Sequence, residues 1–369
     1  MSFAIPDEEM KKIFEADQMP SVQTHKFIWN FIKGIELYDD LGFTHISTRP
    51  VTDYPVFPKK IFLKKNWKVN LNGKEVILTE IPFINTSLLK IVTRVISSLY
   101  YSINKYRKIQ NKGGVIVYSV HVPFMLTGYI VSKVYKIDFI CIWTDPPSVR
   151  NDKDSFLKGI FRKMESFIAR FLMKKATKVI ALTKQLAEDF APNSPYLIVE
   201  GIIDENDVRH PKMRNQTKSS NCLKVVYTGS LQKRYGIQNI VNGFILMNDS
   251  SVVLEIYGRG DYEEELLRIC SSHHNIRYNG FMPNDEILKI QKEADFLINA
   301  RSAEDEYVKY SFPSKTLEYM LSGTPLITTM LPGIPEEYRD CVLVLEDNEP
   351  KTICQTLEHI VQMSEEEKY

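Results

Sequence analysis

The sequence predicts an α/β protein made of two doubly wound, Rossmann-like domains that face each other across a cleft. Short apolar segments alternate with longer segments of helical periodicity, which is typical of parallel α/β sheets. The alternation stops at a polar stretch, residues 210–221, and then begins again. A chain of 369 residues is also too long for one ordinary core, so two domains of roughly 150 to 200 residues each are expected.

In the first half, three apolar segments are predicted to be strands of one sheet. They cover residues 114–120, 138–143 and 178–182. Residues 124–135 and 155–175 lie between them and repeat their apolar side chains at helical spacing. These elements define an N-terminal domain over residues 1–205.

The second half repeats the strand and helix pattern. Its predicted strands cover residues 223–228, 251–257, 295–299 and 325–329. A helix is expected at about 236–247, and an acidic helix start at 261–265. These elements define a C-terminal domain over residues 206–350, and residues 351–369 are expected to form a helix that packs back on the N-terminal domain.

The composition indicates a cytoplasmic protein. It is 44% hydrophobic and 25% charged, as in globular proteins, and it contains no apolar run of about 18 residues. Its first residues have no basic region followed by an apolar core, so no secretory signal is expected. The five cysteines form no C-x-x-C pair, which argues against a zinc site and a disulfide framework.

The charges are unevenly distributed, although the net charge is only +1. Residues 1–200 contain 29 Lys+Arg and 19 Asp+Glu, a net charge of +10. The rest contains 18 Lys+Arg and 27 Asp+Glu, a net charge of −9. This division indicates different partners for the two domains, such as an anionic lipid surface or a phosphorylated acceptor for the basic half. Nucleic acid is not expected, because the basic half has no RNA-binding aromatic motif or recognition helix.

Two strand ends carry glycines that can bring the backbone close to a phosphate. Gly229 and Ser230 end the strand at 223–228, and Arg234 follows before the next helix. A helix start offers free N–H groups and a positive dipole end, which favour an anion. Every α/β protein needs such turns, so a purely structural role stays open here. Gly258 is a weaker candidate, because it can equally form a tight turn.

The segment YSFPSKTLEYMLSGTPLI, residues 310–327, is more specific. It resembles the donor-binding signature of the GT-B glycosyltransferases of family 4. In that family a helix start faces the diphosphate of a nucleotide-sugar, and a glutamate one turn later holds the ribose. The resemblance implies these roles for Ser314, Lys315 and Glu318, which can share one face of a helix. The alternatives are a surface lysine and a solvated helix glutamate.

The resemblance extends to three further segments. The loop NGFMP, residues 279–283, is similar to one that recognises the base, which implies a role for Phe281. Residues 118–123 resemble a strand that ends in a histidine at the cleft, which implies that His121 contacts the donor sugar. Residues 20–27 resemble a loop that touches acceptor and phosphate.

Three more side chains are candidates in the first half: Asp145, expected with His121 to be catalytic, and two residues on the acceptor side. Asp145 follows the next strand after His121 and can orient the acceptor. His25 and Lys26 lie in the segment that resembles the acceptor loop. A structural role is the alternative for both His121 and Asp145.

Three positions depart from the family pattern. The family pairs two glutamates eight positions apart, but Tyr310 stands eight before Glu318, so Glu304 or Glu306 is the candidate substitute. Ser230 stands where the family has arginine, and Tyr235 where it has lysine. The charge for the phosphate then falls to Arg234 and Lys315.

The resemblance implies a retaining hexosyltransferase that uses a nucleoside-diphosphate sugar. UDP is expected from its prevalence in the family, and no metal or other cofactor is expected. The acceptor is expected to be a glycan or lipid-linked glycan in surface polysaccharide synthesis. Two alternatives are a glycosyltransferase that extends a protein-linked glycan, and an inactive nucleotide-binding partner subunit, which the three departures favour.

Two basic stretches of the first half also carry many apolar side chains. Residues 51–184 hold 24 Lys+Arg and only 8 Asp+Glu, and the stretches 87–108 and 155–175 interleave these charges with apolar residues. Such helices can lie on an anionic bilayer, which predicts attachment at the inner face of the cell membrane. The alternative is a pair of ordinary helices with an apolar face on the core and a solvated basic face.

Overall fold

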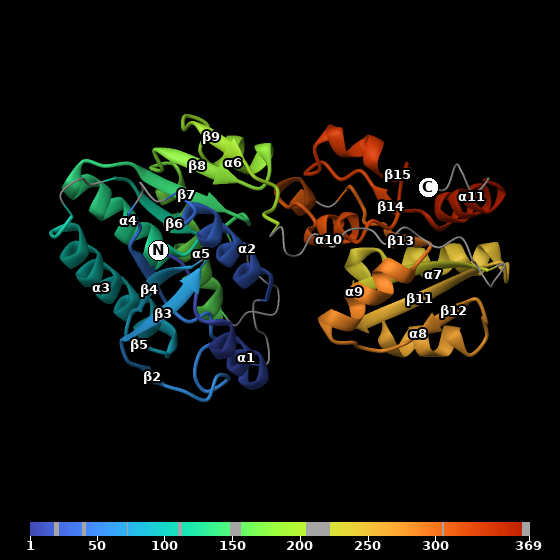
Figure 1. Cartoon of the computed structure of the whole chain (residues 1–369), viewed down its shortest axis with the longest axis horizontal. Helices are drawn as coiled ribbons and strands as arrows, with labels where there is room; N and C mark the ends of the chain where they lie inside the picture. The colour runs from blue at the N-terminus through green and yellow to red at the C-terminus, as the bar shows by residue number, and fades with distance from the viewer. Residues whose placement is uncertain are drawn as a thin grey trace. The chain divides into compact units, whose positions relative to one another are not determined.

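The computed structural model describes residues 1–17, 22–38, 42–71, 73–109, 113–147, 156–203, 222–304 and 306–363. The chain divides into two compact units, Met1–Ile202 and Ile203–Tyr369 (Figure 1). The domain boundary predicted after residue 205 and the polar segment 210–221 lie outside the described residues.

The main sheet of the first unit has four parallel strands in the order β6-β7-β8-β9. Their bounds are β6 Val115–Tyr118, β7 Phe139–Trp143, β8 Lys178–Ala181 and β9 Tyr196–Ile198. The first three confirm the strands predicted for this half. Their side chains are mostly buried, as expected for parallel strands that helices cover.

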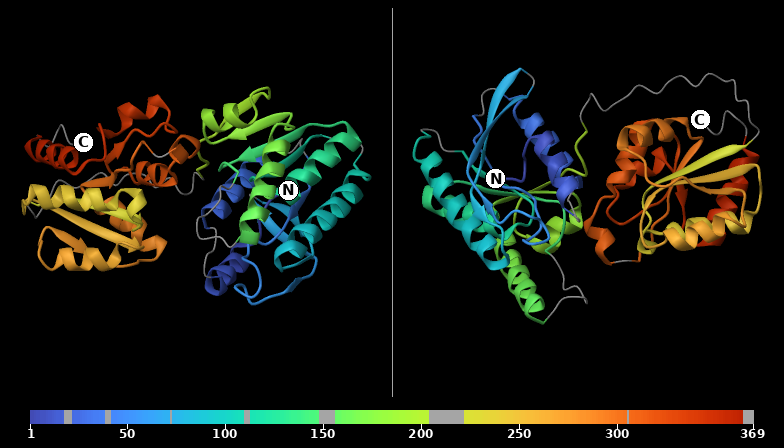
Figure 2. Two further views of the ribbon diagram at one scale, coloured as in Figure 1. Left: turned by 180° about the vertical axis from the view of Figure 1, so that it is seen from behind. Right: turned by 90° about the horizontal axis from the view of Figure 1, so that it is seen from below.

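Three helices form one layer, in which the middle helix packs on this sheet and contacts the other two (Figure 2). They are α3 (Ser87–Tyr106), α4 (Val122–Tyr135) and α5 (Phe156–Met173). α4 lies directly on the sheet, because a Cβ at Gly128 would approach Val117 Cγ2 to 2.7 Å. A short helix, α6 (Lys184–Phe190), connects β8 to β9. Within the described part of the chain, no helix is both long and apolar enough to span a bilayer.

A second, mixed sheet in this unit was not predicted. Its order is β1-β4-β3, with β1 and β4 parallel and β3 and β4 antiparallel, and β2 and β5 form a separate antiparallel pair. The bounds are β1 His45–Ser47, β2 Ile61–Phe62, β3 Lys65–Leu71, β4 Lys74–Glu80 and β5 Phe83–Ile84. Met1 and Ser2 link this sheet to the main one: Tyr118 N–H donates to Met1 O at 2.9 Å, and Ser2 N–H donates to Ile46 O at 3.0 Å.

Two helices lie in the described chain between the first residues and β1. They are α1 (Asp7–Ala16) and α2 (Val22–Ile35). The prediction of an acceptor loop at residues 20–27 is therefore wrong from Val22 onward, and His25 and Lys26 lie in α2. The reason is the helical spacing of Ile28, Trp29 and Ile32, which are buried in the core of this unit.

The second unit contains one parallel sheet of six strands in the order β12-β11-β10-β13-β14-β15. The bounds are β10 Leu223–Ser230, β11 Val252–Arg259, β12 Ile276–Tyr278, β13 Phe296–Asn299, β14 Leu326–Thr329 and β15 Leu343–Leu345. Four of these confirm the strands predicted from the sequence. This order is that of a doubly wound sheet, in which the direction of winding reverses between β10 and β13.

The helices of the second unit follow its strands in turn. They are α7 (Ile237–Met247), α8 (Glu263–Cys270), α9 (Asn284–Glu293), α10 (Ser314–Ser322) and α11 (Pro350–Gln362). α11 corrects the prediction of a C-terminal helix on the other domain. Its buried face, which includes Ile353, belongs to the core of the second unit, and Ile353 Cγ2 would lie 2.7 Å from a Cβ at Gly243 of α7. Residues 364–369 lie outside the described residues.

Candidate functional site

The most suitable ligand site of the second unit is the carboxyl edge of its sheet, at the point where β10 and β13 are neighbours. Ligands of open α/β sheets bind at such a reversal point, because the loops there turn to opposite faces and leave a crevice. β10 ends at Gly229 and Ser230. β13 is followed by Ala300 and Arg301, so these four residues meet at the same edge.

Glycines keep this edge free of side chains. Gly258 has a φ of 146°, and a Cβ there would lie 1.8 Å from Gly229 O on the neighbouring strand. Gly236 has a φ of 82°, and its Cβ would lie 1.8 Å from Ala300 O. Only glycine fits either position, so the backbone of adjacent strands and turns lies in direct contact.

Lys315 reaches over the end of β10 from the start of α10. Its Cε lies 3.9 Å from the position of a Cβ at Gly229. α10 begins at Ser314, which is exposed. Thr316 N–H donates to Pro313 O at 2.9 Å, and the N–H groups of Ser314 and Lys315 precede this first bond. The ammonium group and the positive end of the helix therefore face the same bare stretch of backbone.

Glu318 lies one turn into α10, where two donors hold it. Lys315 Nζ donates to Glu318 Oε1 at 2.6 Å, and Gln291 Nε2 donates to the same oxygen at 2.7 Å. Gln291, on α9, also donates to Thr228 Oγ1 of β10 at 2.9 Å. Tyr319 Oη donates to Thr228 O at 2.9 Å, so three elements meet at this point. No bond to Glu318 Oε2 is found among the described residues.

Two arginines stack on Tyr235, one of the residues that departs from the family pattern. Arg301 Cζ lies 4.5 Å and Arg234 Cζ 4.8 Å from the centroid of its ring. Arg234 Nη2 also donates to Tyr235 Oη at 2.9 Å. Cations favour the face of an aromatic ring, so the Tyr235 ring holds two positively charged groups at the position where the resembled family has a lysine.

Arg301 was not singled out from the sequence. It follows β13 in a loop without a motif, and only the strand order brings it beside β10. Burial raises the pKa of Tyr227 to about 12, and the nearby Arg301 opposes this rise. Tyr227 Oη donates to Ser230 O at 2.9 Å, so the Arg301 charge lies close to the end of β10. The one signal in the sequence that could have indicated Arg301 was its position just after an apolar strand.

The remaining donor-side candidates lie on the neighbouring loops. Phe281 is 62% exposed, and Arg259 Cζ at the end of β11 lies 5.0 Å from its ring centroid. Tyr310 ends the 3₁₀ turn η3 (Glu306–Tyr310) and is partly buried. Glu304 is exposed, and the side chain of Glu306 lies outside the described residues.

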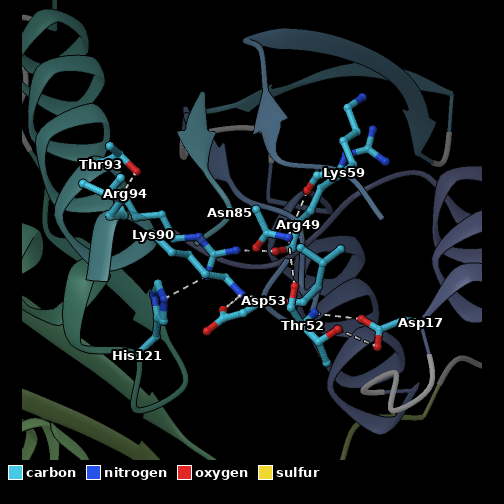
Figure 3. A network of polar contacts seen from close by, with 12 residues as sticks. Asp17, Arg49, Thr52, Asp53, Lys59, Asn85, Lys90, Thr93, Arg94 and His121 are labelled. Carbon is cyan, nitrogen blue, oxygen red and sulfur yellow. Dashed lines mark hydrogen bonds and ion pairs between the residues drawn. The ribbon is translucent and has the colours of Figure 1, made fainter. Parts of the chain in front are cut away.

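In the first unit, His121 and Asp145 follow two adjacent parallel strands, β6 and β7, at the same edge. The His121 ring lies between Phe3 and Phe124, with centroid distances of 4.9 and 4.8 Å. Arg94 Nη1 donates to His121 Nε2 at 3.4 Å (Figure 3). Burial and the Arg94 and Lys90 charges lower the pKa of His121 well below its usual value, so the imidazole is neutral.

The other candidates of the first unit have partners of their own. Asp145 is exposed, and Thr144 Oγ1 donates to its Oδ2 at 2.9 Å. His25 Nε2 lies 2.8 Å from Asp7 Oδ1, and Lys26 beside it is exposed. No group of three or more His, Cys, Asp or Glu side chains arranged to hold a metal occurs among the residues described.

Comparisons with known proteins find a family that matches the second unit. The family described as Glycosyl transferases group 1 matches residues 222–363. An uncharacterized glycosyltransferase of Methanocaldococcus jannaschii is 24% identical over 199 residues, which are 50% of this chain and 50% of that protein. The chain thus spans about half the length of this curated relative. Residues 222–363 are therefore similar to a group 1 glycosyltransferase domain, which agrees with the donor-binding resemblance found in the sequence.

Two solved structures are similar over most of the chain. The α,α-trehalose-phosphate synthase (UDP-forming) from Burkholderia vietnamiensis has a TM-score of 0.61 at 9% identity, covering 91% of this chain and 90% of that one. Sucrose-phosphate synthase from Thermosynechococcus elongatus has a TM-score of 0.60 at 14% identity, covering 93% and 84%. These similarities confirm the α/β fold with parallel sheets that GT-B glycosyltransferases share.

Proposed function

We propose that this chain is a retaining hexosyltransferase that moves a sugar from a UDP-sugar to a glycan or lipid-linked glycan. The observation that supports this function is the cationic edge of the second unit. There Lys315, Arg301 and the start of α10 lie around the bare backbone at Gly229. The trehalose-phosphate synthase is named for forming UDP, which supports UDP as the nucleotide.

The proposed role of this edge is to bind the diphosphate. The acceptor oxygen bonds to the anomeric carbon while the bond from that carbon to the diphosphate breaks, and the hydroxyl proton leaves with the diphosphate. Negative charge grows on the leaving group, so Lys315, Arg301 and the amides of α10 stabilise the transition state more than the ground state. Arg234 adds charge at the rim.

The other donor contacts are assigned by position. Glu318 Oε2 accepts from the ribose hydroxyls, because Oε1 already receives Lys315 and Gln291. Phe281 and its loop face the base, and Tyr310 with its loop holds the sugar. His121 serves as a neutral imidazole near the sugar, and its low pKa makes it a poor general base. Asp145, His25 and Lys26 belong to the acceptor side.

The experiment is a thermal-shift panel of UDP-, GDP- and ADP-sugars, followed by measurement of nucleotide release with and without glycan acceptors. We expect UDP-sugars to raise the Tm most and to release UDP. A Tm rise with GDP- or ADP-sugars alone contradicts the proposed donor. Turnover is expected to persist in EDTA, and a requirement for Mg²⁺ or Mn²⁺ contradicts the proposal that protein cations alone neutralise the diphosphate.

An inactive nucleotide-binding subunit is the second candidate. The uncharged residues Ser230, Tyr235 and Tyr310 favour it, since each stands where the family carries a charge. The two arginines stacked on Tyr235 favour the active enzyme, because they return positive charge to that place. Donor binding without release of UDP, with any acceptor supplied, supports the inactive subunit.

A further inference from the structure

Helix α3 turns its polar side toward the protein and its apolar side toward the solvent. Its buried residues are Arg94, Ser98 and Ser102. Five large apolar side chains are exposed and repeat at helical spacing along the opposite side: Leu88, Leu89, Val92, Ile96 and Tyr100. A helix at the surface of a globular protein normally has the reverse polarity.

Specific bonds fix this orientation. Lys90 Nζ donates to Val51 O at 2.6 Å and to Asp53 at 2.8 Å (Figure 3). Arg94 Nη2 donates to Arg49 O at 2.6 Å, and Ser98 Oγ hydrogen-bonds to Thr127 Oγ1 of α4 at 2.6 Å. A rotation of the helix that buried its exposed apolar side would break all of these hydrogen bonds.

Helix α5 presents a second apolar stripe. Its exposed apolar side chains are Ile160, Phe161, Met164, Phe167 and Phe171. Phe167 is 74% exposed, which is unusual for an aromatic side chain. α4 contacts both α3 and α5, so the two stripes belong to one layer of helices in the first unit. The alternative interpretation, in which both helices place their apolar faces on the core, does not hold for these side chains.

The surroundings of the two stripes are basic. α3 and α4 contain no Asp or Glu, and Glu165 is the one acid in α5. Exposed lysines and arginines follow or flank the stripes: Lys105, Arg107 and Lys108 on or after the last turn of α3, and Lys163, Arg170 and Lys174 on or after α5. The connection between β2 and β3 contains Leu63, which is 73% exposed, between exposed Lys60 and Lys64.

We propose that the exposed face of α3 and α5, the α3/α5 face, binds an anionic lipid bilayer. Apolar side chains would enter the boundary between headgroups and acyl chains, and the flanking cations would meet the lipid phosphates. A second copy of this chain fits less well, because a symmetric dimer would bring the two basic faces together. The proposal rests on this surface alone and does not depend on the enzymatic function.

The test is flotation of the full chain with vesicles of phosphatidylcholine containing about 30% phosphatidylglycerol, against vesicles of phosphatidylcholine alone. The variant carries Val92→Gln, Ile96→Gln, Phe167→Gln and Phe171→Gln. The matched control carries Leu246→Gln and Leu267→Gln, which replace apolar residues of the second unit that are also exposed. Circular dichroism and size-exclusion chromatography with light scattering check the fold and the oligomeric state of all three proteins.

We expect the wild type and the control to float with the anionic vesicles, and the α3/α5 variant to bind at least about tenfold more weakly. Binding should also decrease between about 0.05 M and about 0.5 M salt, because the cations contribute through screened attraction. Absence of wild-type flotation at low salt, or equal binding by the folded α3/α5 variant, overturns the proposal. A wild-type dimer that does not float and that the variant converts to monomer assigns the face to a second copy instead.

Discussion

Lys315 and Glu318 share one short contact at the start of α10, and each has a different proposed partner on the donor. The Lys315 ammonium lies on Glu318 Oε1 at 2.6 Å and also extends over Gly229. Both side chains are about one quarter exposed, at 26% and 27%. An ion pair this accessible is worth little to stability, so both groups can turn to a ligand at small cost.

Lys315→Ala is expected to weaken UDP binding about tenfold or more, because a hydrogen bond to a charged group is worth about 1.5–3 kcal/mol. Isothermal titration calorimetry with UDP measures the effect. Lys289→Ala on α9 is the control, since Lys289 is exposed in the same unit and lies outside the candidate site. Equal UDP affinity for the wild type and Lys315→Ala would remove Lys315 from the diphosphate site.

Arg301 allows a sharper test, because its charge and its stacking on Tyr235 can be separated. Arg301→Ala is expected to lower kcat/KM by about tenfold to a hundredfold, since it removes a cation from the leaving group. Arg301→Lys keeps the charge but loses the planar stack, and it should recover part of the loss. Steady-state release of UDP measures all variants, and Arg268→Ala on α8 is the control. Full activity of Arg301→Ala contradicts the assigned role.

At the scale of helices and strands, local patterns predicted most of the parallel sheets. The strands at 223–228 and 295–299 were found because continuous apolar runs mark buried parallel strands. The antiparallel pair β2–β5 was missed because each strand has only two residues. The pair β3–β4 was missed because most of β3 is exposed and the pair is defined by pairing rather than by composition.

The candidate site also combines residues that a local pattern predicts with one that only strand pairing brings to the site. Ser314, Lys315 and Glu318 are close together in the sequence, so one helical turn was enough to predict their arrangement. Arg301 was missed because it reaches the site only through the pairing of β13 with β10, more than sixty residues away in the chain. His25 and Lys26 were assigned to a loop because the apolar spacing after Val22 was not weighed against the resemblance.

The packing of α11 can be tested with one substitution. Ile353→Ala removes a fully buried side chain that contacts α7, and it is expected to destabilise the second unit by about 2–5 kcal/mol. Lys351→Ala, an exposed position in the same helix, is the control. All three tryptophans, Trp29, Trp67 and Trp143, belong to the first unit.

Urea denaturation of Ile353→Ala should therefore give different results by circular dichroism and by tryptophan fluorescence. Circular dichroism reports both units, and Ile353→Ala should shift part of its transition to lower urea. Tryptophan fluorescence reports the first unit and should stay unchanged. If the fluorescence transition moves as far as the circular dichroism transition, the two units unfold together.

At the scale of the whole molecule, the two units differ in whether their charged side chains are buried or exposed. The first unit contains a buried ionic cluster in which Arg49 donates to Glu80 and to Glu9, each at 2.6 Å. Bonds from Lys12 first, and from Arg49 next, lower the pKa of Glu9 to about 2. The second unit holds most of the acidic residues of the chain, and in the described residues they are mainly exposed.

The first unit is therefore expected to lose stability in acid. The pKa of Glu9 is lower in the folded state than its usual 4.5, so the unfolded chain binds the proton first as the pH falls. The contribution of Glu9 is complete above about pH 4.5 and is lost toward about pH 2. Urea denaturation followed by tryptophan fluorescence across this range measures the loss. Glu9→Gln should show a smaller dependence on pH, and an equal dependence contradicts the assignment.

The glycines at the carboxyl edge of the second unit decide where variation can be introduced. Gly258 and Gly236 each face a carbonyl oxygen that a Cβ would approach to 1.8 Å, so any substitution must move a strand. In a library of variants designed to accept a new donor, substitutions at these two positions would give proteins that do not fold. Tyr235, Phe281 and Arg301 line the same edge without such contacts, and saturation mutagenesis there samples donor preference on an intact scaffold.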